Sequence, residues 1–368
     1  MGELKKTPLY DEHVKLGAKI VEFSGWSMPV FYSNVIEEHL NTREKAGLFD
    51  ICHMGEFFIE GNGAFALIQM LITNDLNRLE DGKAFYTHMC RDDGGIIDDV
   101  FVYRFDKNKF MVVVNAANVE KDFNWFLRNK DFFDDAVVID KTSELAKLDL
   151  QGPKSEDILQ KLTHADLRSL KRFSFIEEEV NGVQTIISRT GYTAEDGFEL
   201  YFDSGKAVEI WNRLLDVGRE FGLKPVGLGA RNTLRVEACY SLYGHELSED
   251  INPFEVCVGF VVKLDKVDFI GKAALEKIKE RGLSRKIVAF EMLDKGIPRQ
   301  DYEACKNNGI IGYVTSGTMS PTYKKGIGMA FVKKEEALEE NEINIKIREK
   351  LYPAKIVKRP FYKFKGKI

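Results

Sequence analysis

Two adjacent aspartates, Asp98 and Asp99, open an apolar stretch that follows a Gly-Gly turn and ends near Tyr103. A strand directs successive side chains to opposite faces, so Asp99, Phe101 and Tyr103 are expected to share one face. Asp98 is expected on the other face, where two valines indicate the core. A carboxylate beside two aromatic rings suits a flat polar ligand, whereas a half-buried edge strand with a solvated acid is the plainer interpretation.

Two short motifs offer further polar groups. His53 lies between Cys52 and Met54, and its imidazole could act as a general base or as a hydrogen-bonded structural group. Asn115 ends an apolar run, where its amide could bind the edge of a ring or stabilise a turn. The residues of these two motifs alone do not distinguish between the roles named.

A polar loop and a helix supply the remaining candidates. The loop from 188 to 199 is too long and polar for a tight hairpin, and it carries Tyr192 and Glu199 toward its two ends. Functional loops have this character, and so do plain solvated connections. Arg231 and Arg235 are four residues apart, which places them on one helix face. Their guanidinium groups could hold a carboxylate or a ring oxygen, or form surface ion pairs.

The composition is that of an ordinary globular protein with two or three domains. The chain has 368 residues, a formal net charge of −5 and no dominant basic block, so a nucleic-acid role has little support. No apolar run approaches about 18 residues, which argues against a membrane span. The first residues also lack the apolar core of a secretory signal.

The cysteine and glycine patterns argue against several kinds of site. The five cysteines are odd in number and widely spaced, which indicates reduced thiols and a cytoplasmic protein. The sequence has no CxxC and no HExxH motif, so no metal is expected. It also lacks the P-loop and GxGxxG motifs, so no nucleotide is expected.

The elements that must position these residues form a unit that occurs twice, in the order β-α-β-β-β-α. Each unit indicates an α+β lobe with a mostly antiparallel sheet, and two such lobes would leave a ligand cleft between them. In the second unit, Glu199 and Tyr201 are expected to point away from the core face. The first unit has strands near 56–60, 84–90, 96–104 and 110–115 and helices near 64–72 and 119–127, the last with Asn118 as its expected N-cap. The second has strands near 145–150, 173–180, 183–189 and 198–202 and helices near 154–162 and 207–217.

The last part of the chain has a different pattern. A charged helix ends near 281, and strand-like runs follow near 287–292, 310–315, 328–332 and 343–348, which predicts a small barrel or sandwich. The tail from 355 to 367 mixes lysines with aromatic residues. It is either a solvated basic edge or a docking surface for an acidic partner.

Taken in order, several motifs resemble the T proteins of the glycine cleavage system, which are aminomethyltransferases. The resemblance extends from Thr7 to Tyr362 without large gaps. Singly each motif is weak, and the ordered series is specific. The motifs include Thr7-Pro-Leu-Tyr, Phe23-Ser-Gly-Trp-Ser-Met-Pro, the Gly-Gly-Ile-Ile-Asp-Asp run, Val114-Asn-Ala-Ala-Asn, Asp196-Gly-Phe-Glu, Gly227-Leu-Gly-Ala-Arg and Asn252-Pro-Phe-Glu.

The resemblance implies a three-domain cloverleaf around folate, with two related α+β lobes and a C-terminal barrel-like domain. One folate-binding lobe would be discontinuous, from 1–52 and 141–275, and the inserted lobe, 53–140, would carry the catalytic aspartate. The β domain would span 276–368. The implied reaction moves an aminomethyl carbon from the lipoyl arm of the H protein to tetrahydrofolate, giving 5,10-methylenetetrahydrofolate and ammonia. Tetrahydrofolate would be a co-substrate, and no metal, nucleotide, nucleic acid or membrane would take part.

The resemblance also implies roles for single residues. Asp99 matches the catalytic acidic residue, and Asp98 its non-catalytic neighbour. Phe101 joins the expected folate site because it shares the strand face of Asp99. Cys52 and Lys363 stand where serine and arginine are commoner in the family. The positions that match folate contacts are Met54, Tyr86, Tyr103, Asn115, Tyr192, Glu199, Arg231 and Tyr362.

Two other functions remain open on the same scaffold. One is a folate-dependent demethylase acting on a methylated amine or sulfonium, which would need the same acid and ring pocket. The other is a non-enzymatic folate-binding protein that helps assemble iron–sulfur proteins. Those relatives carry a Lys-Gly-Cys…Gly-Gln-Glu motif, which this chain lacks.

Overall fold

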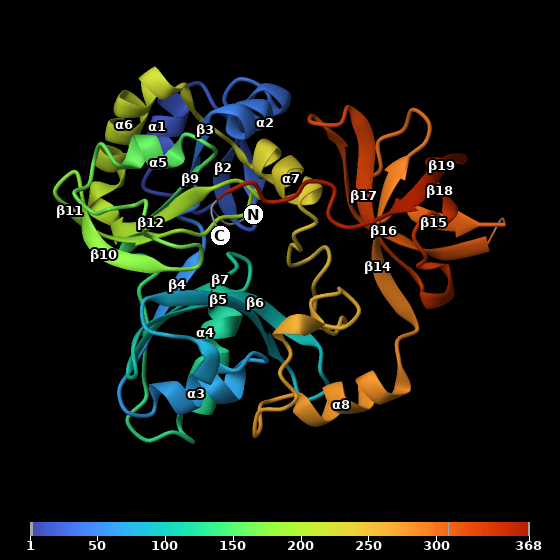
Figure 1. Cartoon of the computed structure of the whole chain (residues 1–368), viewed down its shortest axis with the longest axis horizontal. Helices are drawn as coiled ribbons and strands as arrows, with labels where there is room; N and C mark the ends of the chain where they lie inside the picture. The colour runs from blue at the N-terminus through green and yellow to red at the C-terminus, as the bar shows by residue number, and fades with distance from the viewer. Residues whose placement is uncertain (1–2, 308, 367–368) are drawn as a thin grey trace.

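The structure is a computed structural model that describes residues 3–307 and 309–366. Figure 1 shows two lobes one above the other on the left and a β domain on the right, joined by extended connections. Lys367, the last residue of the expected basic tail, lies outside the described residues. None of the helices within them is long and apolar enough to cross a membrane.

The first lobe is a five-stranded sheet with two helices on one face. The sheet has the order β5-β6-β7-β4-β8. Its core forms where Val100 and Val102 of β6 meet Leu67 of α3 and Phe126 of α4, all fully or almost fully buried. The elements are α3 (Ala64–Leu71), α4 (Val119–Lys130), β4 (Gly55–Glu60), β5 (Lys83–Cys90), β6 (Ile96–Asp106), β7 (Lys109–Val114) and β8 (Val137–Asp140).

The second lobe is a six-stranded sheet of order β10-β11-β12-β9-β3-β13. Because β3 precedes the first lobe in the chain, this sheet is assembled from two separate stretches of sequence. All its pairings are antiparallel except that of β13 with β3. The strands are β3 (Ala46–Asp50), β9 (Leu145–Gln151), β10 (Phe175–Val180), β11 (Val183–Ser188), β12 (Gly197–Asp203) and β13 (Leu223–Pro225); the helices are α1 (Tyr10–Lys15), α2 (Val35–Glu44), α5 (Ser155–Leu159) and α6 (Ala207–Gly218). A separate hairpin pairs β1 (Lys19–Phe23) with β2 (Trp26–Phe31).

The expected repeat is confirmed in the strand order. The run β5-β6-β7-β4 in the first lobe corresponds to β10-β11-β12-β9 in the second, with α3 and α5, and α4 and α6, at matching places in the chain. Alternation in β12 follows the prediction. Phe198, Leu200 and Phe202 enter the lobe core, and Glu199 and Tyr201 face the other way.

The last part of the chain forms a closed barrel of order β14-β17-β16-β15-β18-β19. Closure leaves no free sheet edge. The sequence predicted a barrel or sandwich but missed β15 and β19, and the tail expected from 355 begins inside β19. The barrel strands are β14 (Arg285–Met292), β15 (Glu303–Lys306), β16 (Gly309–Ser320), β17 (Lys325–Lys333), β18 (Glu342–Ile347) and β19 (Lys350–Val357). Two helices precede them, α7 (Leu228–Glu237), which packs near α2 and β2, and α8 (Lys272–Arg281). Short 3-10 helices span Leu76–Arg78, Ser204–Lys206, Arg219–Phe221, Gly259–Val261 and Lys334–Glu336.

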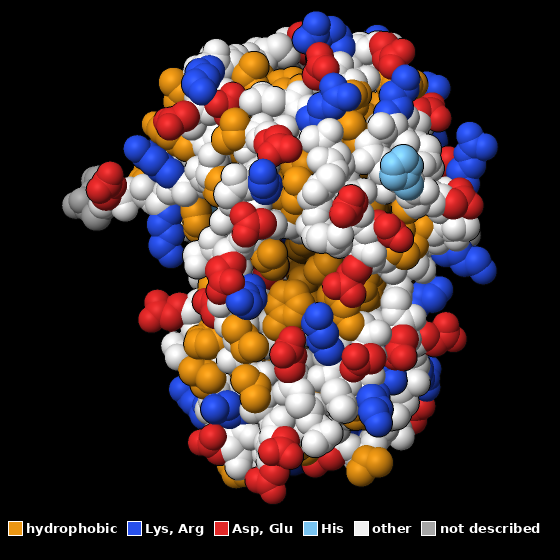
Figure 2. All heavy atoms as spheres, turned by 90° about the vertical axis from the view of Figure 1, so that its left-hand side faces the viewer, with side chains coloured by type: hydrophobic (Ala, Val, Ile, Leu, Met, Phe, Trp, Pro, Cys, Tyr) orange, Lys and Arg blue, Asp and Glu red, His pale blue; other side chains and the backbone are white. Residues whose placement is uncertain are grey.

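The two lobes pack through the sheet faces opposite their helices. Tyr103 and Met111 of the first lobe meet Phe175 and Tyr201 of the second in one buried cluster. The Ala84 backbone N–H also donates to the Phe173 carbonyl across this interface at 2.8 Å. Seen from the side of the two lobes, hydrophobic side chains gather around a hollow near the middle of the face (Figure 2). The architecture of two α+β lobes and a barrel confirms the expected fold class.

Candidate active site

A single cavity of about 1530 Å³ takes its walls from both lobes and from the last part of the chain. The first lobe contributes β5, β6 and the turn after β7. The second contributes β9, β12 and the loop before β12. The remaining wall comes from α7, the segment that follows it, and the C-terminal tail at Arg359 and Pro360.

The side chains of the two aspartates point to opposite faces of β6, as the alternation predicts. Asp99 lines the cavity, whereas Asp98 is completely buried behind it. Asn115 joins the pair, because its side-chain amide donates to Asp98 at 2.8 Å and to Asp99 at 2.7 Å. Tyr86 donates its hydroxyl to the second oxygen of Asp99 at 3.0 Å. Asn118 stands at the start of α4 without capping it. Its side chain instead donates to Asp98 at 2.6 Å.

These surroundings adjust the acidity of Asp99. Burial raises the pKa of Asp99 to about 7, and the negative charge of Asp98 adds to the rise. The hydrogen bonds from Tyr86 and Asn115 favour the ionised form and oppose it. Asp99 can therefore gain or lose a proton near neutral pH, which is the range that suits acid–base chemistry.

Glu199 faces the same cavity from the second lobe. It accepts hydrogen bonds from Thr190 at 2.6 Å and Tyr201 at 3.3 Å, and the Lys147 ammonium lies 3.6 Å away. Burial opposes ionisation of Glu199, but Lys147 and Thr190 outweigh it and hold the pKa of Glu199 below its usual value. At neutral pH this side chain is an anion with acceptor capacity to offer a ligand.

The loop before β12 is held by one glutamine. A Cβ on Gly191 would lie 2.2 Å from the Gln151 amide, so a larger residue would have to displace that side chain. Gln151 donates to the Thr190 carbonyl at 2.9 Å and accepts from Thr193 at 2.7 Å. The loop thus presents Tyr192, whose ring stacks on Tyr240 with centroids 5.8 Å apart.

Helix α7 brings Arg231 to the cavity. Its guanidinium donates to Asp149 at 2.9 Å and lies 4.8 Å from the centre of the Tyr192 ring. Burial raises the pKa of Asp149 to about 7, with Glu199 adding to the rise and Arg231 opposing it. Arg235, one turn later, also lines the cavity and is held by Glu246 at 2.8 Å. The two arginines therefore face the cavity from buried ion pairs, and not from the surface.

Eight of the ten residues expected at the site lie on the cavity wall. Tyr103 lies behind it, fully buried, with its hydroxyl 2.9 Å from that of Tyr201 and 3.4 Å from Glu199. Tyr362 is also behind the wall. Its hydroxyl donates to Glu195 at 2.5 Å, and the Arg43 guanidinium stacks on its ring. The eight on the wall are Met54, Tyr86, Asp99, Phe101, Asn115, Tyr192, Glu199 and Arg231.

His53 reaches the cavity, but burial lowers the pKa of its imidazole to about 4. It is therefore neutral at neutral pH, and among the described residues its Nδ1 has no hydrogen-bond partner. Sequence reasoning missed four basic residues on the wall, Arg78, Lys147, Arg172 and Lys263. Lys147 could have been noticed, because it interrupts an apolar strand. The other three give no such signal in the sequence.

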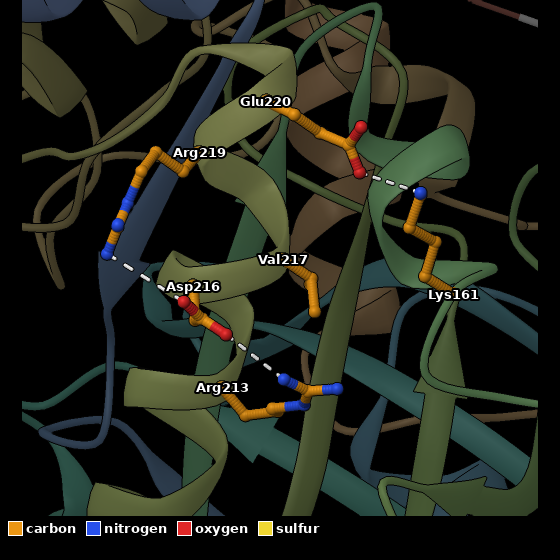
Figure 3. A pocket seen from close by; sticks show the side chains of 6 residues that line it. All are labelled: Lys161, Arg213, Asp216, Val217, Arg219 and Glu220. Atoms are coloured by element: carbon orange, nitrogen blue, oxygen red, sulfur yellow. Dashed lines mark hydrogen bonds and ion pairs between the residues drawn. The ribbon is translucent and has the colours of Figure 1, made fainter.

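Two other features carry no chemistry of their own. Figure 3 shows a shallow hollow beside α6, where Lys161 pairs with Glu220 at 2.7 Å and Arg213 with Asp216 at 3.0 Å. These exposed charges already have partners. Within residues 3–307 and 309–366, no cluster of three His, Cys, Asp or Glu side chains could hold a metal ion.

Two families of sequences match the chain, one after the other. The GCVT N-terminal domain matches residues 9–266, and the glycine cleavage T-protein C-terminal barrel domain matches residues 285–363. The boundary between them coincides with α8, which leads into the barrel.

Individual relatives match over their whole length. An aminomethyltransferase of Thermoanaerobacter pseudethanolicus is 51% identical over 366 residues, covering 99% of both chains. One from a Geobacillus species is 48% identical, covering 98% of this chain and 99% of its own. The crystal structure of the glycine cleavage system aminomethyltransferase T from Bartonella henselae superposes with a TM-score of 0.93 at 31% identity, covering 99% of this chain and 100% of that one. The chain belongs to the glycine cleavage T-protein family of aminomethyltransferases.

Proposed function

We propose that this aminomethyltransferase moves a carbon from the aminomethylated lipoyl arm of an H protein to tetrahydrofolate, releasing ammonia and forming 5,10-methylenetetrahydrofolate. The observation that carries the proposal is the pair of carboxylates on one cavity wall. Asp99 comes from the first lobe with a pKa near 7, and Glu199 comes from the second lobe as an anion. The two can serve different parts of one ligand.

The cavity suits a folate in several respects. A pterin ring presents a ring N–H beside an exocyclic amine, and a buried carboxylate such as Glu199 can accept both. The rings of Phe101 and Tyr192 provide flat apolar walls. Farther along, Arg172 and Arg359 add positive charge, which suits the carboxylates of a glutamate tail. Because Glu199 is an anion on the cavity wall, a ligand that donates paired hydrogen bonds is favoured over an apolar one.

The bound folate would supply the nucleophilic nitrogens, and the protein would supply their orientation and a place for the proton. The Asp99 carboxylate, held by Tyr86 and Asn115, can orient a nitrogen, offset positive charge that develops on it and take up a proton. Such help is typically worth about 10²–10⁴ in rate. The rest would come from holding both substrates together, an effect that reaches about 7–11 kcal/mol at best.

The proposal includes the division of the chain into domains and the cellular compartment in which the protein acts. The two folate-facing lobes would be 1–52 with 141–275, and 53–140, followed by the barrel domain 276–368. In support, β3 pairs with β9 across the inserted stretch, and Asp99 and Glu199 come from different lobes. All five cysteines are free thiols, which fits a reducing compartment such as the cytoplasm.

The decisive experiment measures 5,10-methylenetetrahydrofolate formed from aminomethylated H protein. We expect turnover that requires both the loaded H protein and tetrahydrofolate. Folate titration alone is not enough, because a demethylase or an assembly factor on this scaffold would also bind folate. Folate binding without turnover of loaded H protein would contradict the proposal.

A further inference from the structure

A buried histidine lies beside the proposed catalytic aspartate. His88 of β5 pairs across the sheet with Asp99 of β6 and is completely inaccessible to solvent. Its Nε2 lies 3.1 Å from the hydroxyl oxygen of Tyr86, the residue that donates to Asp99. Its Nδ1 is also buried and has no hydrogen-bond partner within residues 3–307 and 309–366. Among the described residues, the imidazole therefore has one hydrogen-bond partner, Tyr86.

The number of available hydrogens fixes which group donates and which accepts in the hydrogen bonds that link His88, Tyr86 and Asp99. The Tyr86 hydroxyl has one hydrogen, and the ionised Asp99 carboxylate can only accept, so that hydrogen points at Asp99. The Tyr86 oxygen must then accept from His88, which requires the hydrogen of the neutral imidazole to be on Nε2. Burial lowers the pKa of His88 to about 3, so a second ring proton is absent at neutral pH.

We propose that His88 is a positioning residue that acts through Tyr86: its Nε2–H fixes the tyrosine hydrogen on Asp99. The inference rests on the function proposed above, in which Asp99 acts as a carboxylate. A donor to the Tyr86 oxygen polarises the O–H bond and strengthens the hydrogen bond to Asp99. It also removes the freedom of the hydroxyl to rotate away. Tyr86 lines the cavity and His88 does not, so His88 cannot touch a substrate directly.

Other groups also act on Asp99 and must be separated from His88. Asp98 on the same strand raises the pKa of Asp99, and Asn115, from the turn after β7, opposes it. Asp122 of α4 is buried beyond Asp98, and burial holds its pKa well above the usual value. Tyr192 faces Asp99 from the loop before β12, and burial raises its pKa as well. Unlike His88, none of these four groups forms a hydrogen bond with the Tyr86 hydroxyl in the described part of the chain.

The first test needs no enzymatic activity. In protein with ¹⁵N-labelled histidines, the ring signals of His88 would be assigned by their loss in His88→Gln. We expect the neutral Nε2–H tautomer at pH 8, where Asp99 is ionised, with and without folate. An Nδ1–H tautomer or a charged ring at pH 8 would overturn the proposal, because Tyr86 would then donate to His88 or lose its donor. The tautomer can be measured even if the wild-type protein shows no aminomethyl transfer. A lack of transfer would count against the proposed function and not against the role of His88.

The second test uses two substitutions of matched size. The amide nitrogen of Gln can replace the Nε2–H donor, whereas Leu fills the space without a donor. We expect His88→Leu to lower kcat about tenfold, as for loss of one buried hydrogen bond, with the KM for tetrahydrofolate changed less than about twofold. His88→Gln should recover most of this loss. Equal losses for Leu and Gln would show a packing role and reject the proposal.

A double-mutant cycle tests the route through Tyr86. In a Tyr86→Phe background the hydroxyl is gone, so His88→Leu should lower kcat by less than about twofold. In the wild-type background His88→Leu should move the acidic limb of the kcat/KM profile to higher pH, because the ionised form of Asp99 loses support. Fully additive losses in the cycle would mean that His88 does not act through Tyr86.

Discussion

Asp98 and Asp99 are neighbours in the sequence, yet strand geometry sends their carboxylates into different surroundings. Asp98 is completely buried and accepts from two asparagines, Asn115 and Asn118. Asp99 opens into the cavity and accepts from Tyr86. One residue therefore organises the turn after β7, and the other is available to a substrate. The two remain coupled, because burial and then the charge of Asp98 raise the pKa of Asp99.

Replacing Asp99 by Asn tests its direct role. The Asn amide keeps the shape but can neither take up a proton nor offset positive charge. We expect kcat to fall about 10²–10⁴-fold while tetrahydrofolate still binds. Steady-state kinetics and calorimetry on the same preparation would check both statements. Retention of half the wild-type kcat by the folded Asp99→Asn variant would remove Asp99 from the mechanism.

The pH profile tests the surroundings of Asp99. If the carboxylate is the active form, kcat/KM falls as the pH drops through about 7, the pKa of Asp99. Asp98→Asn removes a charge that raises this pKa, so the acidic limb should move to lower pH. Tyr86→Phe removes a donor that lowers it, so the limb should move to higher pH. Shifts of both variants in the same direction would contradict the assignment.

Glu199 and Glu56 provide a matched pair for the binding site. Both are buried acids of the same size, but Glu199 is held ionised on the cavity wall, whereas burial raises the pKa of Glu56 to about 8. Glu199→Gln should weaken tetrahydrofolate binding about tenfold or more, since a charge-assisted pair of hydrogen bonds is lost. Glu56→Gln replaces an already neutral group and should change the affinity less than about twofold. Calorimetry at pH 7 would compare them.

At the scale of elements, the sequence predicted the features that depend on residues close together in the chain. Alternation in β6 and β12 identified the cavity-facing side chains, and helical spacing located α6, because one face of each element is buried. Strands that depend on distant partners were missed. The β3 strand pairs with β9 about a hundred residues later, and β19 contains a proline and lysines that resemble a tail. Its pairing with β14 and β18 within the closed barrel overrides that composition.

One buried lysine ties the segment before α8 to the first lobe. The Lys266 ammonium donates to the carbonyls of Gln69, in the last turn of α3, and of Ile72 and Asn74, just after it, at 2.5, 2.6 and 2.9 Å. Lys266→Met would leave these carbonyls unsatisfied and should lower the free energy of unfolding by about 2–4 kcal/mol. Lys277→Met, on the exposed face of α8, is the control and should change it by less than about 0.5 kcal/mol. Denaturant unfolding would measure both, and equal values would leave the lysine without this role.

At the scale of the whole molecule, the C-terminal tail connects the barrel to the second lobe. Figure 1 shows it leaving the barrel and running past α7 toward the upper lobe. The Tyr362 N–H donates to the Glu237 carbonyl at 2.8 Å, and Arg172 lies between the rings of Phe173 and Phe364. Eight of the ten residues expected at the site lie on the cavity wall, some because strand alternation indicated them and others, such as Tyr86, only through the family resemblance. The sequence did not predict that Tyr103 and Tyr362 lie behind that wall, because depth is set by how the parts pack.

The sequence left two interpretations of the tail open, a solvated basic edge and a docking surface for an acidic partner, and the structure narrows which of its charges are available. Lys355 pairs with Glu340, and Arg359 donates to the carbonyls of Val256 and Cys239 at 3.3 Å each. Lys358 and Lys363 are exposed, and among the described residues neither has an ion-pair partner. Exposed charges of this kind mainly speed association and are screened by salt.

We therefore expect reversal of Lys358 and Lys363 to Glu to raise the KM for H protein about three- to tenfold at low ionic strength and less than about twofold at 0.5 M salt. The KM for tetrahydrofolate should stay within about twofold, because the cavity wall is untouched. The control is the double reversal of Lys277 and Lys279, which are exposed on α8 and change the net charge equally. If both double variants raise the KM for H protein to the same extent, the effect belongs to net charge, and the tail is only a solvated edge.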